Sequence, residues 1–213
     1  MSGELTAAWL ALADQAEAQV TAVAATYVAG ATAQTRFIET AAASVYAANL
    51  AATAYADTAV TAWRLATVGL PTTTLGLLPP ADEQERLVRA FATICAHMQG
   101  MSASVEERSK RVARSEPLQR GHRAYQDALR ERGVEQWRRV VQPDACERCA
   151  PLAGSIHDMD EDFTDHPNCR CTLAPTTGDG WADRQRREQL QLRRTWDTAA
   201  GQVRFSSGLT IIR

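Results

Sequence analysis

The sequence predicts a mainly α protein with a small β element that carries a zinc-binding loop. Apolar residues recur at steps of three and four through the N-terminal part, and helix-capping patterns recur further along the chain. Four of the five cysteines fall within one short segment, from Cys146 to Cys171. We therefore expect three parts: an alanine-rich helical arm over residues 1–80, a compact zinc-stapled domain over 81–176, and a C-terminal helix and tail over 177–213.

The arm is expected to contain two long helices separated by the sequence AGATAQT. The apolar stripe of the first helix comprises Trp9, Leu12, Ala16, Val20, Val23 and Tyr27. The stricter heptad seam of the second comprises Ile38, Ala41, Val45, Ala48, Ala52, Tyr55, Ala59 and Ala62. Small alanines on that seam allow helices to approach closely. We expect either a hairpin that packs on itself, which we favour, or an arm whose seam binds a partner chain or a second copy.

The arm is expected to end at GLPTTTLGLLPPAD, because the glycines and prolines there prevent a helix from continuing. A capping pair, Asp82 with Glu85, then precedes an apolar stripe on one helix face. That stripe comprises Leu87, Phe91, Ile94 and Met98. Cys95 adjoins the stripe, and we interpret it as a buried thiol that packs as a small apolar side chain.

Two further helical segments are expected before the cysteine-rich loop. Ser104 with Glu107 can cap the first, and Ser115 followed by Pro117 indicates that the helix restarts after a bend. Gly133 can end the second segment. Its apolar stripe comprises Leu118, His122, Tyr125 and Leu129. We interpret the histidine of this stripe as a core side chain, and VEQWRRVV predicts a short strand that leads into the loop.

The cysteine-rich loop has the spacing of a tetrahedral metal site. Cys146 and Cys149 form a CxxC pair, whose thiolates can hold one side of an ion. His166 and Cys169 repeat this spacing as HxxC, and Cys171 follows as a further candidate. Two such pairs predict one Cys3His zinc ion (Zn2+) per chain. Spacing leaves open whether Cys169 or Cys171 is the fourth ligand, with a slight preference for Cys169.

The ligand types favour a structural zinc ion over a catalytic one. Three thiolates and one imidazole fill four positions, which leaves none for an activated water. We therefore expect no catalytic residues and no enzymatic activity. His157, in the middle of the loop, is a weaker ligand candidate. The acidic run HDMDEDFTD lacks the ligand spacing of a calcium loop, and we interpret it as solvated.

Composition narrows the function classes further. A formal net charge of -2 argues against a protein whose main task is to neutralise phosphates, so we expect no sequence-specific nucleic-acid binding. The N-terminal segment lacks a basic region, and Asp14 and Glu17 interrupt its alanine-rich stretch. We expect no signal peptide and no membrane span. In a reducing cytoplasm, clustered cysteines bind metal more often than they form disulfides.

Four sequence elements carry a resemblance over roughly residues 82–175. They are Arg114-Ser115-Glu116, the D-x-C-x-x-C run from Asp144, Leu152 with Gly154, and HPNCRC from His166 to Cys171. In this order they resemble the C-terminal domain of the phage Mu F-like minor head proteins, also called phage head morphogenesis proteins. HPNCRC at this distance from CxxC is the most specific element. The acidic loop and the alanine-rich arm differ from the family's usual pattern.

The resemblance implies a structural minor capsid protein of a tailed phage or prophage. Members of this family lie inside the capsid shell, are associated with the portal, and help to assemble a competent head. The implied partners are the portal protein and the major capsid protein. The implied location is the virion interior near the portal vertex, with the host cytoplasm as the location during assembly.

Two other functions remain as alternatives. One is a small zinc-dependent hydrolase or nuclease in which His157 or His166 acts as a base, which requires an open metal position. The other is a zinc-ribbon adaptor that binds nucleic acid through a basic run. That run comprises Arg108, Lys110, Arg111 and Arg114. The acidic segment after Asp144 would repel phosphates from such an adaptor.

Overall fold

The computed structural model describes residues 2–69, 71–97, 102–142, 145–163, 169, 171–178, 180–185, 187, 203–204 and 210–211. Its contacts divide the chain into two compact units. The larger unit comprises Met1–Thr61 with Thr73–Thr176, and the smaller comprises Ala62–Thr72 with Thr177–Arg213. This division differs from the boundary we expected at residue 80, because helices on both sides of that position share one core.

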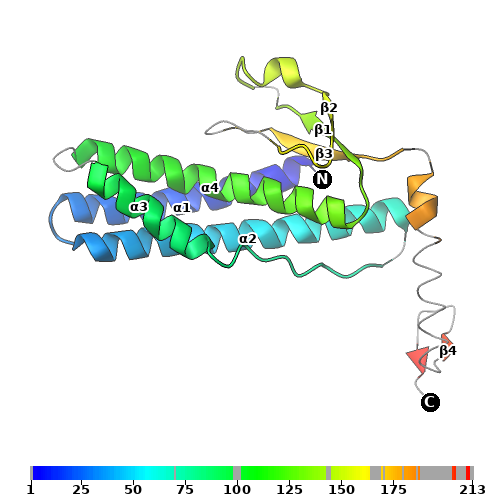
Figure 1. Ribbon diagram of the computed structural model, residues 1–213, viewed down its shortest axis with the longest axis horizontal. Coiled ribbons are helices and arrows are strands. Elements are labelled where there is room, and N and C mark those ends of the chain that lie inside the picture. Colours follow the sequence, from blue (N-terminus) through cyan, green and yellow to red (C-terminus); the bar gives the residue numbers. More distant parts are fainter. Residues whose placement is uncertain are drawn as a thin grey trace. The chain divides into compact units, whose positions relative to one another are not determined.

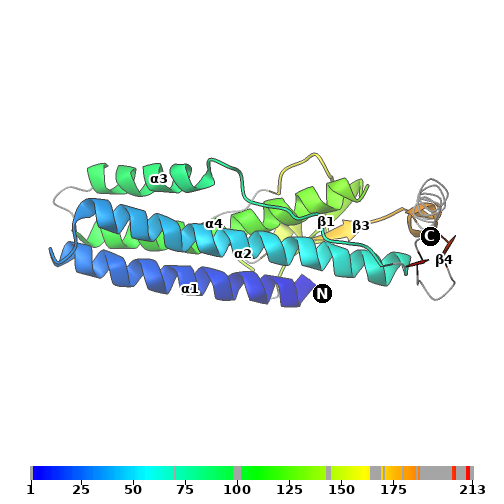
Figure 2. The same ribbon diagram turned by 90° about the horizontal axis from the view of Figure 1, so that it is seen from below.

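The larger unit is mainly helical with a small sheet, which confirms the predicted fold class. Its helices are α1 (Ser2–Val28), α2 (Gln34–Val68, which enters the smaller unit after Thr61), α3 (Glu83–His97) and α4 (Ser102–Glu131). Within this unit α1, α2 and α4 lie side by side, and α3 crosses them obliquely (Figures 1 and 2). No helix in the described part of the chain is both long enough and apolar enough to cross a membrane.

One apolar core joins the four helices. Tyr27 of α1 stacks on Phe37 of α2 with ring centroids 4.9 Å apart, and Phe37 meets Phe91 of α3 edge-on at 6.1 Å. The same core continues into α4 at Val105 and Ala113. The N-terminal hairpin therefore packs against the helices that follow the proline-rich segment, and does not stand apart from them as an arm.

The close approach of α1 and α4 depends on Gly121. Trp9 of α1 is fully buried, and its indole Nε1 donates a hydrogen bond to the carbonyl oxygen of Ala52 at 3.1 Å. Its ring meets His122 and Tyr125 of α4 edge-on, with centroids 5.0 and 6.1 Å away. A Cβ at position 121 would lie 2.6 Å from Trp9 Cε2, so a side chain there would collide with the indole. His122 is a core side chain, as predicted.

The predicted seam of α2 is buried only in its first part. Its positions up to Ala52 are buried, whereas the next one, Tyr55, is 47% exposed. Burial continues instead at Ala56 and Val60, each four residues further on. A straight helix has 3.6 residues per turn, so a heptad seam drifts around it by about 20° per heptad. This drift turns the later seam positions away from the core.

Helix α4 runs without interruption through Pro117, where the sequence predicted two separate helical segments. Pro117 has no amide hydrogen to donate within the helix, yet the helix continues through this position while it packs against α1. The predicted end of the helix is confirmed. Gly133 has a φ of +69°, and the amide of Val134 donates to the carbonyl oxygen of Leu129 at 3.1 Å.

A three-stranded antiparallel sheet follows α4, in the order β2-β1-β3. Its strands are β1 (Gln136–Val140), β2 (Ile156–Asp158) and β3 (Thr172–Thr176), and a short 3-10 helix, η1 (Ala150–Leu152), lies between β1 and β2. β1 is the strand that the sequence predicted. β3 contacts both α1 and α4, so the sheet lies against these two helices (Figure 1).

The smaller unit is described at fewer positions. Residues 181–185 are helical, within the predicted C-terminal helix. The rings of Trp63 and Trp181 lie 5.1 Å apart, and Arg64 Nη2 donates to Gln185 Oε1 at 3.2 Å. The strands of this unit form one antiparallel pair, β4 (Val203–Arg204) with β5 (Thr210–Ile211).

Candidate metal centre

The register of the sheet explains why cysteines that are distant in sequence meet. Val140 at the end of β1 lies opposite Thr172 at the start of β3. The chain leaves β1 toward the CxxC pair, and it enters β3 directly from Cys171. The exit of one strand and the entry of the other are therefore neighbours. This places the CxxC turn beside Cys169 and Cys171.

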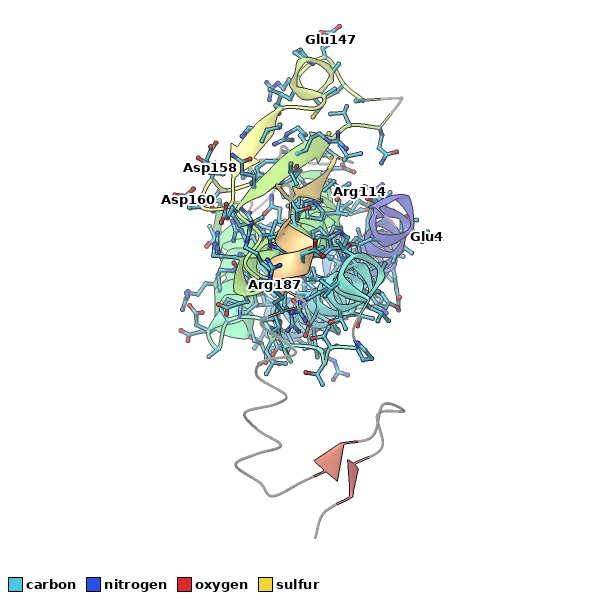
Figure 3. The ribbon with its side chains drawn as sticks, turned by 90° about the vertical axis from the view of Figure 1, so that its right-hand side faces the viewer. Glu4, Arg114, Glu147, Asp158, Asp160 and Arg187 are labelled. Carbon is cyan, nitrogen blue, oxygen red and sulfur yellow. The ribbon has the colours of Figure 1, made fainter. Side chains whose placement is uncertain are left out.

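The CxxC pair is folded into a tight turn. The amides of Cys149 and Ala150 both donate to the carbonyl oxygen of Cys146, at 2.9 and 3.0 Å. η1 follows at once, with Pro151 in its first turn. The Cys149 side chain is buried by this turn, whereas Cys146 is exposed. Glu147, between them, extends from the outer tip of the loop into solvent (Figure 3).

Three buried cysteines form a group that can bind a metal ion. The Sγ atoms of Cys149, Cys169 and Cys171 lie within 4.8 Å of one another, and each residue is at most 3% exposed. The Sγ atoms of Cys149 and Cys169 are 3.7 Å apart, and all three residues are free thiols. In a regular tetrahedron with metal–sulfur bonds of about 2.3 Å, the sulfur atoms are about 3.8 Å apart. The observed separation fits that geometry.

The electrostatics of the group favour a bound cation. Burial raises the pKa of Cys149, and hydrogen bonds with Cys171, Cys169 and Cys146 raise it further. Burial also raises the pKa of Cys169. Crowded buried thiols of this kind keep their protons, because thiolates there would repel one another in a poorly solvated place. A divalent cation reverses this balance, since it supplies the charge that stabilises the thiolates.

The predicted ligands are distributed unequally around this group. The structure brings Cys149 together with both Cys169 and Cys171, between which spacing alone did not choose. Strand geometry is the signal that could have found this, because side chains two residues apart at the entry to a strand point to the same side. Cys146 lies outside the three-cysteine group but forms a hydrogen bond with Cys149. His166 lies outside the described residues.

His157 belongs to a different cluster. Its Nε2 is 2.8 Å from Ser155 Oγ, and its Nδ1 is 3.1 Å from Glu161 Oε2. Its ring stacks on Trp137, with centroids 4.2 Å apart. The sequence prediction did not include Ser155 and Glu161. For Ser155, the signal that could have found it is its spacing, because Ser155 and His157 are two residues apart and share one side of the extended chain.

No protein-family model, curated protein or solved structure matches this chain. Its function is therefore inferred from its own residues, above all from the buried cysteines and the motif that contains them.

Two of the four residues in the basic run of α4, Lys110 and Arg114, form ion pairs within the chain. Arg114 Nη1 is 2.6 Å from Asp14 Oδ1 and 2.8 Å from Glu17 Oε2, both on α1. Lys110 Nζ is 2.8 Å from Glu106 Oε1 on the same helix. These carboxylates neutralise part of the positive charge that would bind a nucleic-acid phosphate. This face of α4 therefore carries charges of both signs.

Proposed function

We propose that this chain is a structural minor capsid protein of a tailed phage or prophage, associated with the portal inside the head. The observation that carries the proposal is the convergence of the two cysteine elements of the resemblance. The CxxC of the D-x-C-x-x-C run contributes Cys149, and HPNCRC contributes Cys169 and Cys171, to one buried group. A motif whose parts meet in this way serves to fold the domain that carries it.

Zinc is the metal that we propose for this group, at one ion per chain. Sulfur ligands in a tetrahedral arrangement favour zinc among the common cellular cations. Cys149, Cys169 and Cys171 supply three ligands, and we assign the fourth to Cys146, whose thiol already reaches Cys149. His166 is the competing fourth ligand, and comparing the zinc content of Cys146→Ser and His166→Ala decides between them.

The proposed role of the ion is structural. Four protein ligands leave no position for a substrate or an activated water. The three cysteines of the group are almost fully buried, which keeps solvent away from the ion. The ion would tie the exit of β1 to the entry of β3. The four protein ligands and the burial of the cysteines support a structural zinc ion over the zinc ion of a hydrolase or nuclease.

Association with the portal is tested with the full chain, because its N-terminal helices share a core with the rest of the larger unit. Co-expressed with the portal protein of the same phage, the chain is expected to co-elute with it in size-exclusion chromatography. Cys149→Ser should weaken this association, whereas Cys95→Ser removes a buried thiol of α3 outside the group and should leave it in place. A wild-type chain that neither co-elutes with the portal nor is found in purified heads would contradict the capsid role.

A further inference from the structure

We propose that Ser155, His157 and Glu161 form a nucleophilic acyl-transfer site that accepts small uncharged esters. This site lies outside the cysteine group and goes beyond the proposed structural role. It also departs from our expectation of no enzymatic activity, which depended on the metal ligands alone. The three residues contain the components that serine-based acyl transfer requires: a hydroxyl, an imidazole and a carboxylate in hydrogen-bonded order.

The distances match those roles. Ser155 Oγ is 2.8 Å from His157 Nε2, within reach for transfer of its proton. His157 Nδ1 is 3.1 Å from Glu161 Oε2 on the opposite side of the ring. Ser155 directly precedes β2 and His157 lies within it, and in extended chain side chains two residues apart share one face. Glu161 returns to them through the turn that follows the strand.

Glu161 fixes the tautomer of the imidazole that the reaction needs. An ionised carboxylate only accepts hydrogen bonds, so the proton of a neutral His157 must sit on Nδ1. The hydrogen bond with His157 lowers the pKa of Glu161, and the amide of Asp158 donates to its other oxygen at 3.2 Å. The Nε2 lone pair therefore faces Ser155. When the imidazole is protonated, the serine hydroxyl has another acceptor in the carbonyl oxygen of Leu152 at 2.8 Å.

Trp137 holds the imidazole in place. The two rings are nearly parallel, at 17°, with centroids 4.2 Å apart. Trp137 is 1% exposed, and its Nε1 donates to the carbonyl oxygen of Asp158 at 3.1 Å, so it forms a fixed platform. The His157 side chain remains 26% exposed. The ring is thus oriented on one face and accessible at its edge, as a general base must be.

The edge of the sheet supplies a backbone donor for the developing oxyanion. β2 is an edge strand, and the amides of Arg139 and Met159 donate to the carbonyl oxygens of Ser155 and Glu135. In an antiparallel pair these bonds alternate with positions that point outward. The amide of Ile156 is one of these outward positions, and it directly follows the nucleophile. A backbone N–H in this position can donate to the oxyanion.

The surroundings indicate the class of substrate. Leu152, whose carbonyl oxygen accepts a hydrogen bond from the Ser155 hydroxyl, is 40% exposed, so it offers an apolar contact to a short acyl group. Asp158 and Asp160 are exposed near the end of β2, where their carboxylates would repel an anion (Figure 3). The open surface suits an unhindered ester better than a long chain that needs a deep pocket.

The reaction consumes only the ester and water. Ser155 Oγ attacks the ester carbonyl carbon as its proton moves to His157 Nε2, and the carbonyl oxygen becomes an oxyanion. When the carbonyl reforms, the C–O bond to the alcohol breaks, and the alkoxide takes the proton from Nε2. The products are an alcohol and an acyl ester on Ser155. Water, activated by the same imidazole, then hydrolyses that ester and restores the free serine.

The experiment uses the full chain with p-nitrophenyl acetate as the probe. We expect release of p-nitrophenol together with an acetyl group that peptide mapping places on Ser155. Ser155→Ala should abolish that adduct, and His157→Gln should slow its formation by about 100-fold, within the range for loss of a general base. Glu161→Gln should slow it by about 10-fold, since the imidazole stays but its tautomer is less firmly fixed.

Ser44→Ala is the matched control, because Ser44 is a half-buried serine of α2 whose hydroxyl donates to the carbonyl oxygen of Thr40 at 2.9 Å. This variant should acylate at the wild-type rate. Circular dichroism of each variant reports whether it folds, and Glu161→Gln keeps the test valid if His157→Gln does not fold. Absence of an adduct on the wild type, an adduct at another residue, or unchanged acylation in folded His157→Gln and Glu161→Gln would each overturn the proposal.

Discussion

The helical core and the cysteine loop are stabilised in different ways. The core of the helices is built from many apolar contacts, such as those of Trp9, Phe37 and Phe91. Each contact adds a small part of the free energy that stabilises the fold. The loop between β1 and β3 is held at two places. Its β2 segment and Phe163 pack on β1 and α4, whereas the CxxC turn and the entry to β3 meet at the buried cysteines. A change in the core should therefore have a graded effect, whereas loss of one cysteine ligand should release the CxxC turn as a unit.

The largest effect is expected from Cys149→Ser. Loss of one ligand should prevent tight metal binding, and the loop should then unfold locally, because binding and folding of a metal site are coupled. Hydrogen exchange should show lost protection over residues 146–153 and retained protection in α1, α4 and β2. Cys95→Ser, which removes a thiol buried in α3, serves as the control. Equal protection of the loop in both variants would remove the distinction between the two regions.

The next largest effect is expected from Gly121→Ala. Its new Cβ would meet the Trp9 ring at 2.6 to 2.8 Å and push α1 away from α4. Overpacking of this kind costs about 1 to 3 kcal/mol, and we expect the upper part of that range because a rigid indole is displaced. Chemical denaturation measures the change. Gly3→Ala, whose Cβ meets open space in α1, should instead leave the protein equally stable or slightly more stable.

A smaller cost, of about 1 to 2 kcal/mol, is expected for Ala52→Leu. Ala52 is fully buried on α2, and its carbonyl oxygen accepts the hydrogen bond from Trp9. Ala54→Leu places the same side chain on the exposed face of the helix and should change the free energy of unfolding little. If the two variants are equally stable, the seam does not pack within the chain, and its contact with a partner becomes the better interpretation.

The smallest effect concerns an ion pair of the helical core. Burial alone would raise the pKa of Glu83, but hydrogen bonds from Arg86 and Asn49 and the charge of Arg86 lower it overall. A lowered pKa in the folded state gives stability that is present above the ordinary value of 4.5 and is lost as the pH falls through the folded value. Denaturation at a series of acidic pH values should show a smaller loss for Glu83→Gln than for the wild type.

The elements that depend on neighbouring residues could be predicted from the sequence. The stripe through Trp9, the helix end at Gly133 and the strand that begins at Gln136 each follow from local periodicity or from a local turn. The contact between Trp9 and Gly121 could not be predicted, because helical periodicity shows which face is apolar and not which helix covers it. At Pro117 the sequence predicted two helical segments, whereas the folded chain forms one continuous helix there.

For the candidate site, too, the sequence predicted local features but not long-range contacts. The spacing of Cys146 and Cys149 predicted a metal-binding turn, but spacing could not choose between Cys169 and Cys171. The structure brings both beside Cys149, because β1 pairs with β3 in a register that is a long-range property. The cluster around His157 was missed for a similar reason. Glu161 reaches the imidazole only because a turn brings the chain back after β2.

The central claim is that the cysteine group holds one structural metal ion. Native mass spectrometry with elemental analysis of the purified full chain measures this most directly. We expect one zinc per wild-type chain, retained during purification and absent from Cys149→Ser, with Cys95→Ser as the control that keeps it. A strong chelator should remove the ion and lower the melting temperature. A wild-type protein that contains no zinc, or a Cys149→Ser variant that retains it in full, would contradict the account.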